Sequence, residues 1–250
     1  MKLVFLGTDT CIPAPGDDTA SYFVEGGLLI DVGWHVTETL RRCGKTPSDV
    51  QSVLFTHCHH DHVMALPALL YERFANNSAG NLHIYGPEAI RGVYERAERY
   101  LEVEKYWPEA QRPTLHILSD GECFETCGYE IKAIASRHAV PGFCYRVTER
   151  GGASVGFSGD TAYFEELGEF FKGCDALVHE YSWGERKSEE NLQKHSDIAD
   201  ASNVAREAGV RTLYPVHGPK ALKEKCGRIG GAIFTAGKIC WPEPNDSIEV

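Results

Sequence analysis

The chain has 250 residues, of which 42% are hydrophobic and 24% are charged, and its formal net charge at pH 7 is −11. This composition is typical of a globular protein with a sizeable core, and we expect residues 1–250 to form a single domain. The acidic balance argues against broad nucleic-acid binding, because neutralising phosphates requires an excess of Lys and Arg at the contact face. The apolar start of the chain is interrupted at residues 7–10, and no segment approaches the roughly 18 apolar residues of a membrane span. We therefore expect a cytoplasmic protein that does not enter the membrane.

The local patterns alternate between strand and helix along the chain. Strands are predicted at 3–6, 21–24, 28–31, 52–55, 115–118, 129–136, 143–148, 153–157, 175–178 and 212–215, with a final short strand pair after them. Helices are predicted at 36–43, 63–75, 87–105, 163–171 and 197–208. This order indicates an α/β protein in which two sheets are covered by helices, a layered αββα arrangement.

Nine cysteines and eleven histidines stand out in the composition. The cysteines are odd in number and lack the paired spacing of a zinc ribbon, and we expect no secretion signal, because residues 7–10 cut the first apolar stretch short. We expect all nine to be reduced thiols. The histidines are different, because four of them fall within residues 57–62.

These four histidines lie in the pattern His-x-His-x-Asp-His, directly after the predicted strand at 52–55. Alternate residues of an extended segment point the same way, so His57 and His59 can hold one ion together. Asp61 and His62 follow once the chain has turned, and they can face a second ion. Imidazole and carboxylate ligands suit Zn, Fe or Mn. A solvated histidine loop is the alternative, and the further His and Asp residues downstream disfavour it.

This pattern is similar to one of the five motifs of the metallo-β-lactamase superfamily, and other segments resemble the remaining four. The match covers nearly the whole chain in order. The segments similar to the five motifs are, in turn, residues 5–8 with 28–33, residues 57–62, His138, residues 159–161 and residues 215–218. The resemblance implies the four-layer αββα metallo-β-lactamase sandwich as the fold.

The resemblance also implies two divalent metal ions, for which we expect Zn, with Mn or Fe as alternatives. One ion would be held by His57, His59 and His138, and the other by Asp61, His62 and His217, with Asp160 between them. Such a pair brings the pKa of a bridging water towards neutrality and polarises the oxygen of an ester. Two neighbours complete this prediction. Asp31 is expected to accept a hydrogen bond from a ligand histidine, and His60 is expected to point away from the metals.

Two further segments resemble the ribonuclease Z branch of this superfamily. They are Val178-His179-Glu180-Tyr181 and Lys194-His195-Ser196. The resemblance implies that His195 protonates the leaving oxygen and that Glu180 orients it, which is the expected task of a positioned His–Glu pair. The predicted catalytic residues are thus Asp61, His195 and Glu180. The plain alternatives are a surface histidine before a helix and a glutamate at the end of a strand.

Several departures from that branch count against a transfer-RNA 3′ processing enzyme. The chain has no basic, Gly-rich arm, its last motif continues as His217-Gly218-Pro219-Lys220, and its net charge is −11. We therefore expect metal-bound hydroxide to cleave a phosphodiester or a related small anionic ester. The alternatives are transfer-RNA processing, a lactone, thioester or acyl-ester hydrolase, and a degenerate domain that binds metal or ligand without catalysis. The oligomeric state stays open, with a homodimer as one candidate, because dimers are common among the proteins that the chain resembles.

Two segments bear on the substrate. The basic residues Lys220, Lys223, Lys225 and Arg228 are either a patch that attracts an anion or one face of a solvated amphipathic helix. Residues 181–193 form a long polar stretch between two site motifs, and we interpret them as a lid or pocket wall.

Overall fold

The computed structural model describes residues 1–250 and contains two seven-stranded sheets. The first sheet has the order β14-β1-β2-β3-β4-β5-β6, with β1 (Lys2–Gly7), β2 (Ser21–Val24), β3 (Leu28–Ile30), β4 (Ser52–Leu54), β5 (His83–Gly86), β6 (Thr114–Ile117) and β14 (Ser247–Glu249). The second sheet has the order β13-β12-β11-β10-β9-β8-β7, with β7 (Cys123–Thr126), β8 (Tyr129–Ala135), β9 (Phe143–Glu149), β10 (Ser154–Phe157), β11 (Ala176–Glu180), β12 (Thr212–Val216) and β13 (Lys238–Ile239).

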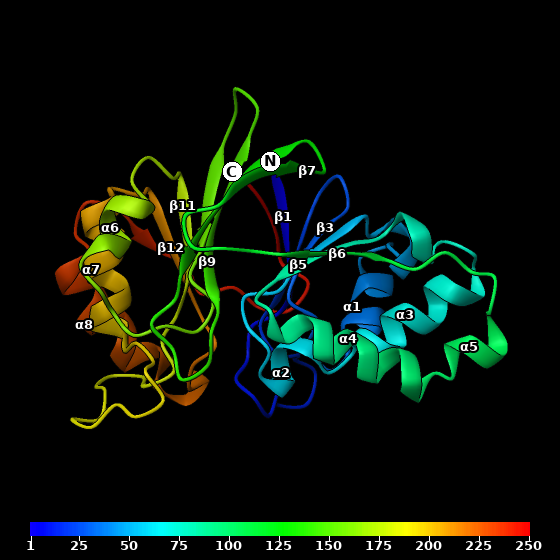
Figure 1. Ribbon diagram of the computed structural model, residues 1–250. Helices are drawn as coiled ribbons and strands as arrows, with labels where there is room; N and C mark the ends of the chain where they lie inside the picture. Colours follow the sequence, from blue (N-terminus) through cyan, green and yellow to red (C-terminus); the bar gives the residue numbers. More distant parts are fainter.

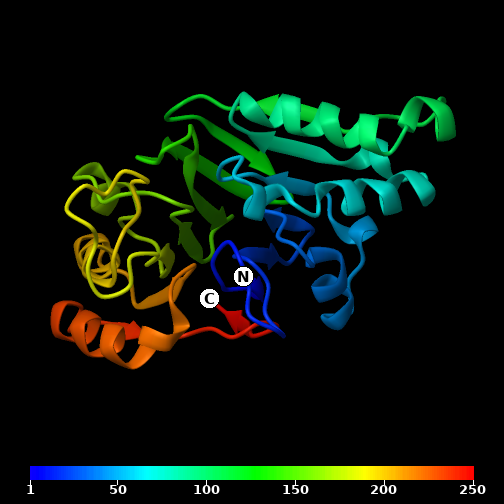
Figure 2. The same ribbon diagram turned by 90° about the horizontal axis from the view of Figure 1, so that it is seen from below.

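Eight α-helices surround these sheets. They are α1 (Val36–Arg42), α2 (His60–Val63), α3 (Leu66–Ala75), α4 (Ala89–Tyr100), α5 (Val103–Tyr106), α6 (Glu166–Phe170), α7 (Ile198–Ala208) and α8 (Lys223–Ile233). The two sheets lie between a layer with α1, α3 and α4 and a layer with α6, α7 and α8 (Figures 1 and 2). The predicted four-layer αββα sandwich is confirmed. No helix has the length and apolar character needed to cross a membrane.

The packing of β1 shows how the sequence produces this layering. Successive side chains of a strand point to opposite faces. Leu3 and Phe5 join the core between the two sheets, whereas Val4 and Leu6 join the core under the helices. Both faces of the strand are therefore buried, which explains why its sequence is continuously apolar rather than alternating.

The structure corrects several predicted elements. The predicted helix at 63–75 is divided into α2 and α3, and the one at 87–105 is divided into α4 and α5 at Glu102, whose φ of 49° interrupts the helix. The final strands do not pair with one another, because β13 pairs with β12 and β14 pairs with β1. The strands β5 and β7 were not predicted.

The strand directions explain where the functional side chains gather. The strands β10, β11 and β12 run parallel, and β8 runs in the same direction because β9 is antiparallel to both β8 and β10. His138, Asp160 and His217 each follow the C-terminal end of one of these strands within three residues. The segment after β4 reaches the same place, where His57 pairs with Gly142 in an isolated bridge. The carboxyl ends of parallel strands are a usual place for ligand sites.

Candidate metal centre

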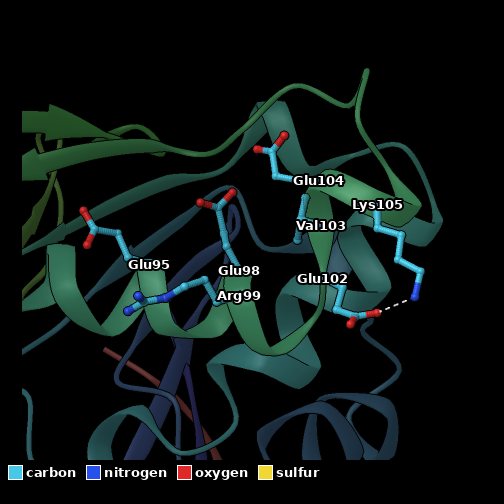
Figure 3. A pocket seen from close by; sticks show the side chains of 7 residues that line it. All are labelled: Glu95, Glu98, Arg99, Glu102, Val103, Glu104 and Lys105. Carbon is cyan, nitrogen blue, oxygen red and sulfur yellow. Dashed lines mark hydrogen bonds and ion pairs between the residues drawn. The ribbon is translucent and has the colours of Figure 1, made fainter.

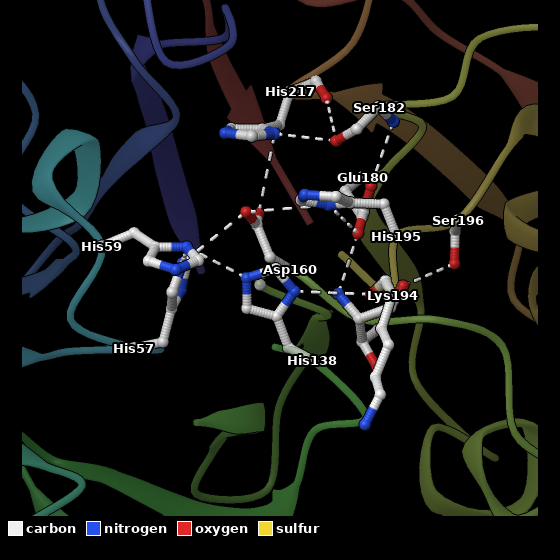
Figure 4. A network of polar contacts seen from close by, with 12 residues as sticks. His57, His59, His138, Asp160, Glu180, Ser182, Lys194, His195, Ser196 and His217 are labelled. Atoms are coloured by element: carbon white, nitrogen blue, oxygen red, sulfur yellow. Dashed lines mark hydrogen bonds and ion pairs between the residues drawn. The ribbon is translucent and has the colours of Figure 1, made fainter. Parts of the chain in front are cut away.

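The first cluster contains three histidines from distant segments. The Nδ1 atom of His59 lies 3.1 Å from Nε2 of His57 and 3.0 Å from Nε2 of His138. Oδ2 of Asp160 lies 3.6 Å from Nε2 of His57. The structure thus brings together the residues predicted to hold one ion, and the ring nitrogens converge on a single point (Figure 4).

The second cluster contains Asp61, His62 and His217. Oδ2 of Asp61 lies 3.1 Å from Nε2 of His217 and 3.4 Å from Nε2 of His62. The carboxylate of Asp160 is 3.6 Å from ring nitrogens of both His62 and His217. Asp160 therefore lies between the two clusters, where the sequence prediction placed it.

The chemistry of these donors fits metal ions. Nε2 of His62 is buried and has no hydrogen-bond partner, which is costly for a polar atom unless another ligand satisfies it. Burial holds the pKa of His57 well below its usual value. Burial raises the pKa of Asp160, but the charges of His217, His62 and His57 outweigh this effect and leave it well below its usual value. A neutral imidazole and an ionised carboxylate are the forms that bind a cation.

Hydrogen bonds from outside the clusters orient the rings. Nδ1 of His62 lies 2.8 Å from Oδ2 of Asp31, so the predicted contact of Asp31 is present. Thr56 donates its backbone N–H and its hydroxyl to the same carboxylate, over 2.8 and 2.7 Å. Ser182 Oγ lies 2.9 Å from Nδ1 of His217 and donates to the His217 carbonyl oxygen. These contacts direct the opposite ring nitrogen of each histidine into the site.

His195 and Glu180 form a third group next to Asp160. Nδ1 of His195 lies 2.9 Å from Oε1 of Glu180 and 3.8 Å from Oδ2 of Asp160. Glu180 is itself fixed by the backbone N–H groups of Thr161 and Ser182, over 2.8 and 3.0 Å. Burial lowers the pKa of His195, but the hydrogen bond and charge of Glu180 outweigh it, so the pKa lies above its usual value.

A cleft of about 580 Å³ opens over these groups. Five members of the three clusters line it: His59, Asp61, Asp160, His195 and His217. Ser182, Trp183 and Gln193 also line it, so the segment predicted to be a lid or wall contributes a wall. His60 belongs to none of the clusters, as predicted, and lies exposed at the rim.

The signals in the sequence did not reveal every neighbour of the site. Trp34 was not predicted to be functional, and Ser182, Trp183 and Asn191 were predicted only as part of the lid or wall segment 181–193. Ser182 follows the Glu180 motif by two residues, which is a weak signal for a hydrogen-bonding role. The other three have no pattern of their own and are found only through their contacts.

Other features of the chain lie apart from this site. Lys220 is paired with Asp17 and Glu243, and Lys223 with Glu243. The structure therefore favours a surface helix over a free anion-binding patch. A separate hollow of about 540 Å³ lies between α4 and α5, where charged side chains such as Glu98 and Lys105 line it (Figure 3). None of the nine cysteines forms a disulfide in the structure.

Comparisons with known proteins agree with the motifs and the fold. The Beta-lactamase superfamily domain matches residues 27–218. Ribonuclease Z from Methanocaldococcus jannaschii is 25% identical over 275 residues, which cover 87% of this chain and 85% of that protein.

Two solved structures share the fold at lower identity. The metallo-β-lactamase fold protein YhfI from Bacillus subtilis has a TM-score of 0.83 at 20% identity and covers 99% of this chain and 98% of its own. The short form of human tRNase Z has a TM-score of 0.74 at 20% identity and covers 100% of this chain and 99% of its own. Because the domain match extends over most of the sequence and includes both buried His/Asp clusters, the chain belongs to the metallo-β-lactamase superfamily, as a distant relative of ribonuclease Z.

Proposed function

We propose that the chain is a hydrolase that binds two divalent ions and cleaves a phosphodiester or a related small anionic ester. The proposed ligands are His57, His59 and His138 for one ion, Asp61, His62 and His217 for the other, and Asp160 for both. When bound, such ions supply hydroxide at neutral pH and polarise the oxygens of the ester. Zn is the first expectation, and Mn and Fe accept the same ligands.

The observation that carries this proposal is the contact between His195 and Glu180 beside the clusters. Glu180 engages Nδ1 of His195 over 2.9 Å, so Nε2 is the atom that can give a proton to the leaving oxygen. The His195 side chain lines the same cleft as Asp61 and Asp160. We assign proton donation to His195, its orientation to Glu180, and a hydrogen bond from the attacking water to the carboxylate of Asp61.

The cleft wall supports a small anionic substrate rather than a nucleic-acid chain. No Lys or Arg is among the residues that line the cleft. Proteins that track a nucleic-acid backbone do so with a positively charged groove. The nearby lysines are already engaged by Asp17 and Glu243.

Cleavage of transfer-RNA precursors is the second candidate, favoured by the relatives named ribonuclease Z. The alignment with the Methanocaldococcus jannaschii protein is longer than the stretch of this chain that it covers, so that protein has segments that this chain lacks. We place the small ester first because no Lys or Arg lines the cleft.

The test compares turnover of bis(p-nitrophenyl) phosphate and diphenyl phosphate, with defined Zn or Mn, by the wild type and His195→Ala. Phenolate is the poorer leaving group and depends more on protonation. We therefore expect His195→Ala to lose about 100-fold or more with diphenyl phosphate and less with the nitrophenyl ester. The control is His116→Ala, since His116 packs on Tyr85, outside the cleft lining.

If His195→Ala hydrolysed each ester as fast as the wild type does, His195 would have no part in the mechanism. A lactone, a thioester and a transfer-RNA precursor are run beside the diesters. Preference for the lactone or thioester would favour the carbonyl-hydrolase alternative, and preference for the RNA would favour the second candidate. Metal analysis showing less than one ion per chain would favour a binding domain without catalysis.

A further inference from the structure

The four tryptophans of the chain divide into two pairs with different surroundings. Trp107 stacks on Phe74, with ring centroids 5.8 Å apart, and Trp241 packs against Tyr181 at 5.2 Å. Trp34 and Trp183 instead line the cleft over the metal clusters. Trp34 is 40% exposed, although an aromatic side chain of this size usually gains stability from burial. The second pair therefore has apolar surface available to a ligand.

The rest of the cleft lining narrows the chemistry of that ligand. Besides the two tryptophans, the apolar lining residues are Cys11 and Ala139, and both are small. The lining contains no Leu, Ile, Val or Met, the side chains that would surround an aliphatic acyl chain. A flat indole ring favours a second flat ring, because offset stacking and edge-to-face contacts add to the buried area.

Trp183 is held in place by the same residue that holds His195. The indole N–H of Trp183 donates to Oδ1 of Asn191 over 2.7 Å. The backbone N–H of His195 donates to the same oxygen over 3.0 Å, and the Asn191 amide donates back to the His195 carbonyl over 2.9 Å. The orientation of the Trp183 ring is thus coupled to the position of His195, to which we assign protonation of the leaving oxygen.

We infer that Trp34 and Trp183 form an aromatic subsite, and that the substrate is an ester with a planar aromatic or heteroaromatic substituent. The inference rests on the proposed function, because it names the substrate class of the same cleft. The substituent stacks on the indoles while the ester group lies at the metal clusters. Asn191 acts as a positioning residue that holds Trp183 and His195 in fixed positions relative to each other.

The experiment compares two diesters, diphenyl phosphate and bis(2,2,2-trifluoroethyl) phosphate, whose arms are planar rings and compact aliphatic groups. Trp183→Leu and Trp34→Leu are assayed with both in the metal-loaded protein, and released alcohol is measured by NMR. We expect kcat/KM for the phenyl ester to fall about 5- to 100-fold in each variant, mainly through KM, because stacking is lost. For the trifluoroethyl ester we expect a change of less than about 2-fold in Trp34→Leu. In Trp183→Leu we expect a smaller loss with this ester than with the phenyl ester, because removal of the indole N–H also frees Asn191 beside His195. Differences in intrinsic reactivity cancel when each variant is compared with the wild type.

Two further variants separate stacking from general damage. Trp183→Phe keeps a ring without the indole N–H, so it should recover part of the preference for the phenyl ester. Tyr106→Leu removes an aromatic side chain that is 58% exposed and lies outside the cleft, so it should leave both esters unchanged. Equal losses with both esters, or no loss with either, would overturn the aromatic subsite and leave the proposed function standing.

A binding measurement tests the aromatic subsite even if the protein hydrolyses neither diester. Calorimetry compares phenylphosphonate with methylphosphonate, neither of which has an ester to hydrolyse. Tighter binding of phenylphosphonate that is lost in Trp183→Leu would support the subsite, and equal affinities would overturn it. If the wild type hydrolyses neither diester, the proposed phosphodiesterase function fails, and the phosphonate comparison alone decides the subsite.

Discussion

Asp31 and His62 are 31 residues apart in the sequence, and in the structure Oδ2 of Asp31 lies 2.8 Å from Nδ1 of His62. Asp31 has a left-handed backbone, with a φ of 56°, and its carboxylate is buried. The same carboxylate accepts from Thr56, the residue directly before the first ligand histidine. One side chain therefore fixes both ends of the His-x-His-x-Asp-His loop.

The substitution Asp31→Asn tests this arrangement. One carboxylate oxygen becomes an NH₂ group, which accepts no hydrogen bond. The side chain therefore loses either the Thr56 N–H at Oδ1 or both the Thr56 hydroxyl and His62 at Oδ2. We expect the affinity for Zn to fall about 10- to 100-fold, as for other partners of metal-binding histidines. Competition with a chromogenic chelator measures the change. Asp49→Asn is the matched control, since Asp49 caps the turn at Thr46 instead. An unchanged zinc affinity in Asp31→Asn would contradict the assignment.

A second prediction concerns Glu180→Gln. The carboxylate accepts from His195, Thr161 and Ser182, and a glutamine can accept at only one of its two ends. We expect kcat for diphenyl phosphate to fall about 10- to 100-fold with little change in KM, because the neutral amide no longer favours the protonated form of His195, whereas the ion ligands stay. Steady-state kinetics and metal analysis on the same preparation check this. Loss of bound metal in parallel with kcat would show that Glu180 acts on the metal centre instead.

Metal removal should lower thermal stability. An ion that binds only the folded state stabilises it by about 2.7 kcal/mol at 100 times its dissociation constant. For a protein of this size we expect Zn to raise Tm by about 5–10 °C over the chelator-treated protein. Differential scanning calorimetry with and without chelator measures the shift. His217→Ala should lose most of it and His116→Ala should keep it, so an equal shift in both variants would refute the assigned ligands.

A fourth prediction uses Gly159, which precedes Asp160. Gly159 has a φ of 54°, and a Cβ added there would lie 2.7 Å from Cβ of Thr56. We expect Gly159→Ala to lower the free energy of unfolding by about 2–3 kcal/mol and to weaken metal binding, because both Thr56 and Asp160 must move.

Gly231→Ala is the matched control for this variant. A Cβ at Gly231 in α8 would meet nothing within 4 Å. We expect that variant to be more stable by about 0.5–1 kcal/mol. Thermal unfolding and metal content check both variants, and wild-type values for Gly159→Ala would contradict the argument.

The layered fold could be predicted because it depends on local patterns. The continuous apolar run of β1 follows from burial on both faces, and Asp197 and Gly209 mark the two ends of α7. The pairing of the strands could not be predicted from local patterns. The β14 strand joins the first sheet beside β1, although it lies at the other end of the sequence. That residues 1–250 form one domain stays a prediction, and the oligomeric state stays open.

The sequence by itself predicted the candidate ligand set through its resemblance to the motifs of the metallo-β-lactamase superfamily, which lie in the same order along the chain. Only the tertiary structure showed that Ser182 contacts His217 and that Trp34 lines the cleft. Trp34 follows β3 in one sheet and Trp183 follows β11 in the other, and no local pattern relates them. Their joint presence in the cleft depends on how the two sheets pack. The substrate class therefore has to be inferred from contacts between segments that are distant in the chain.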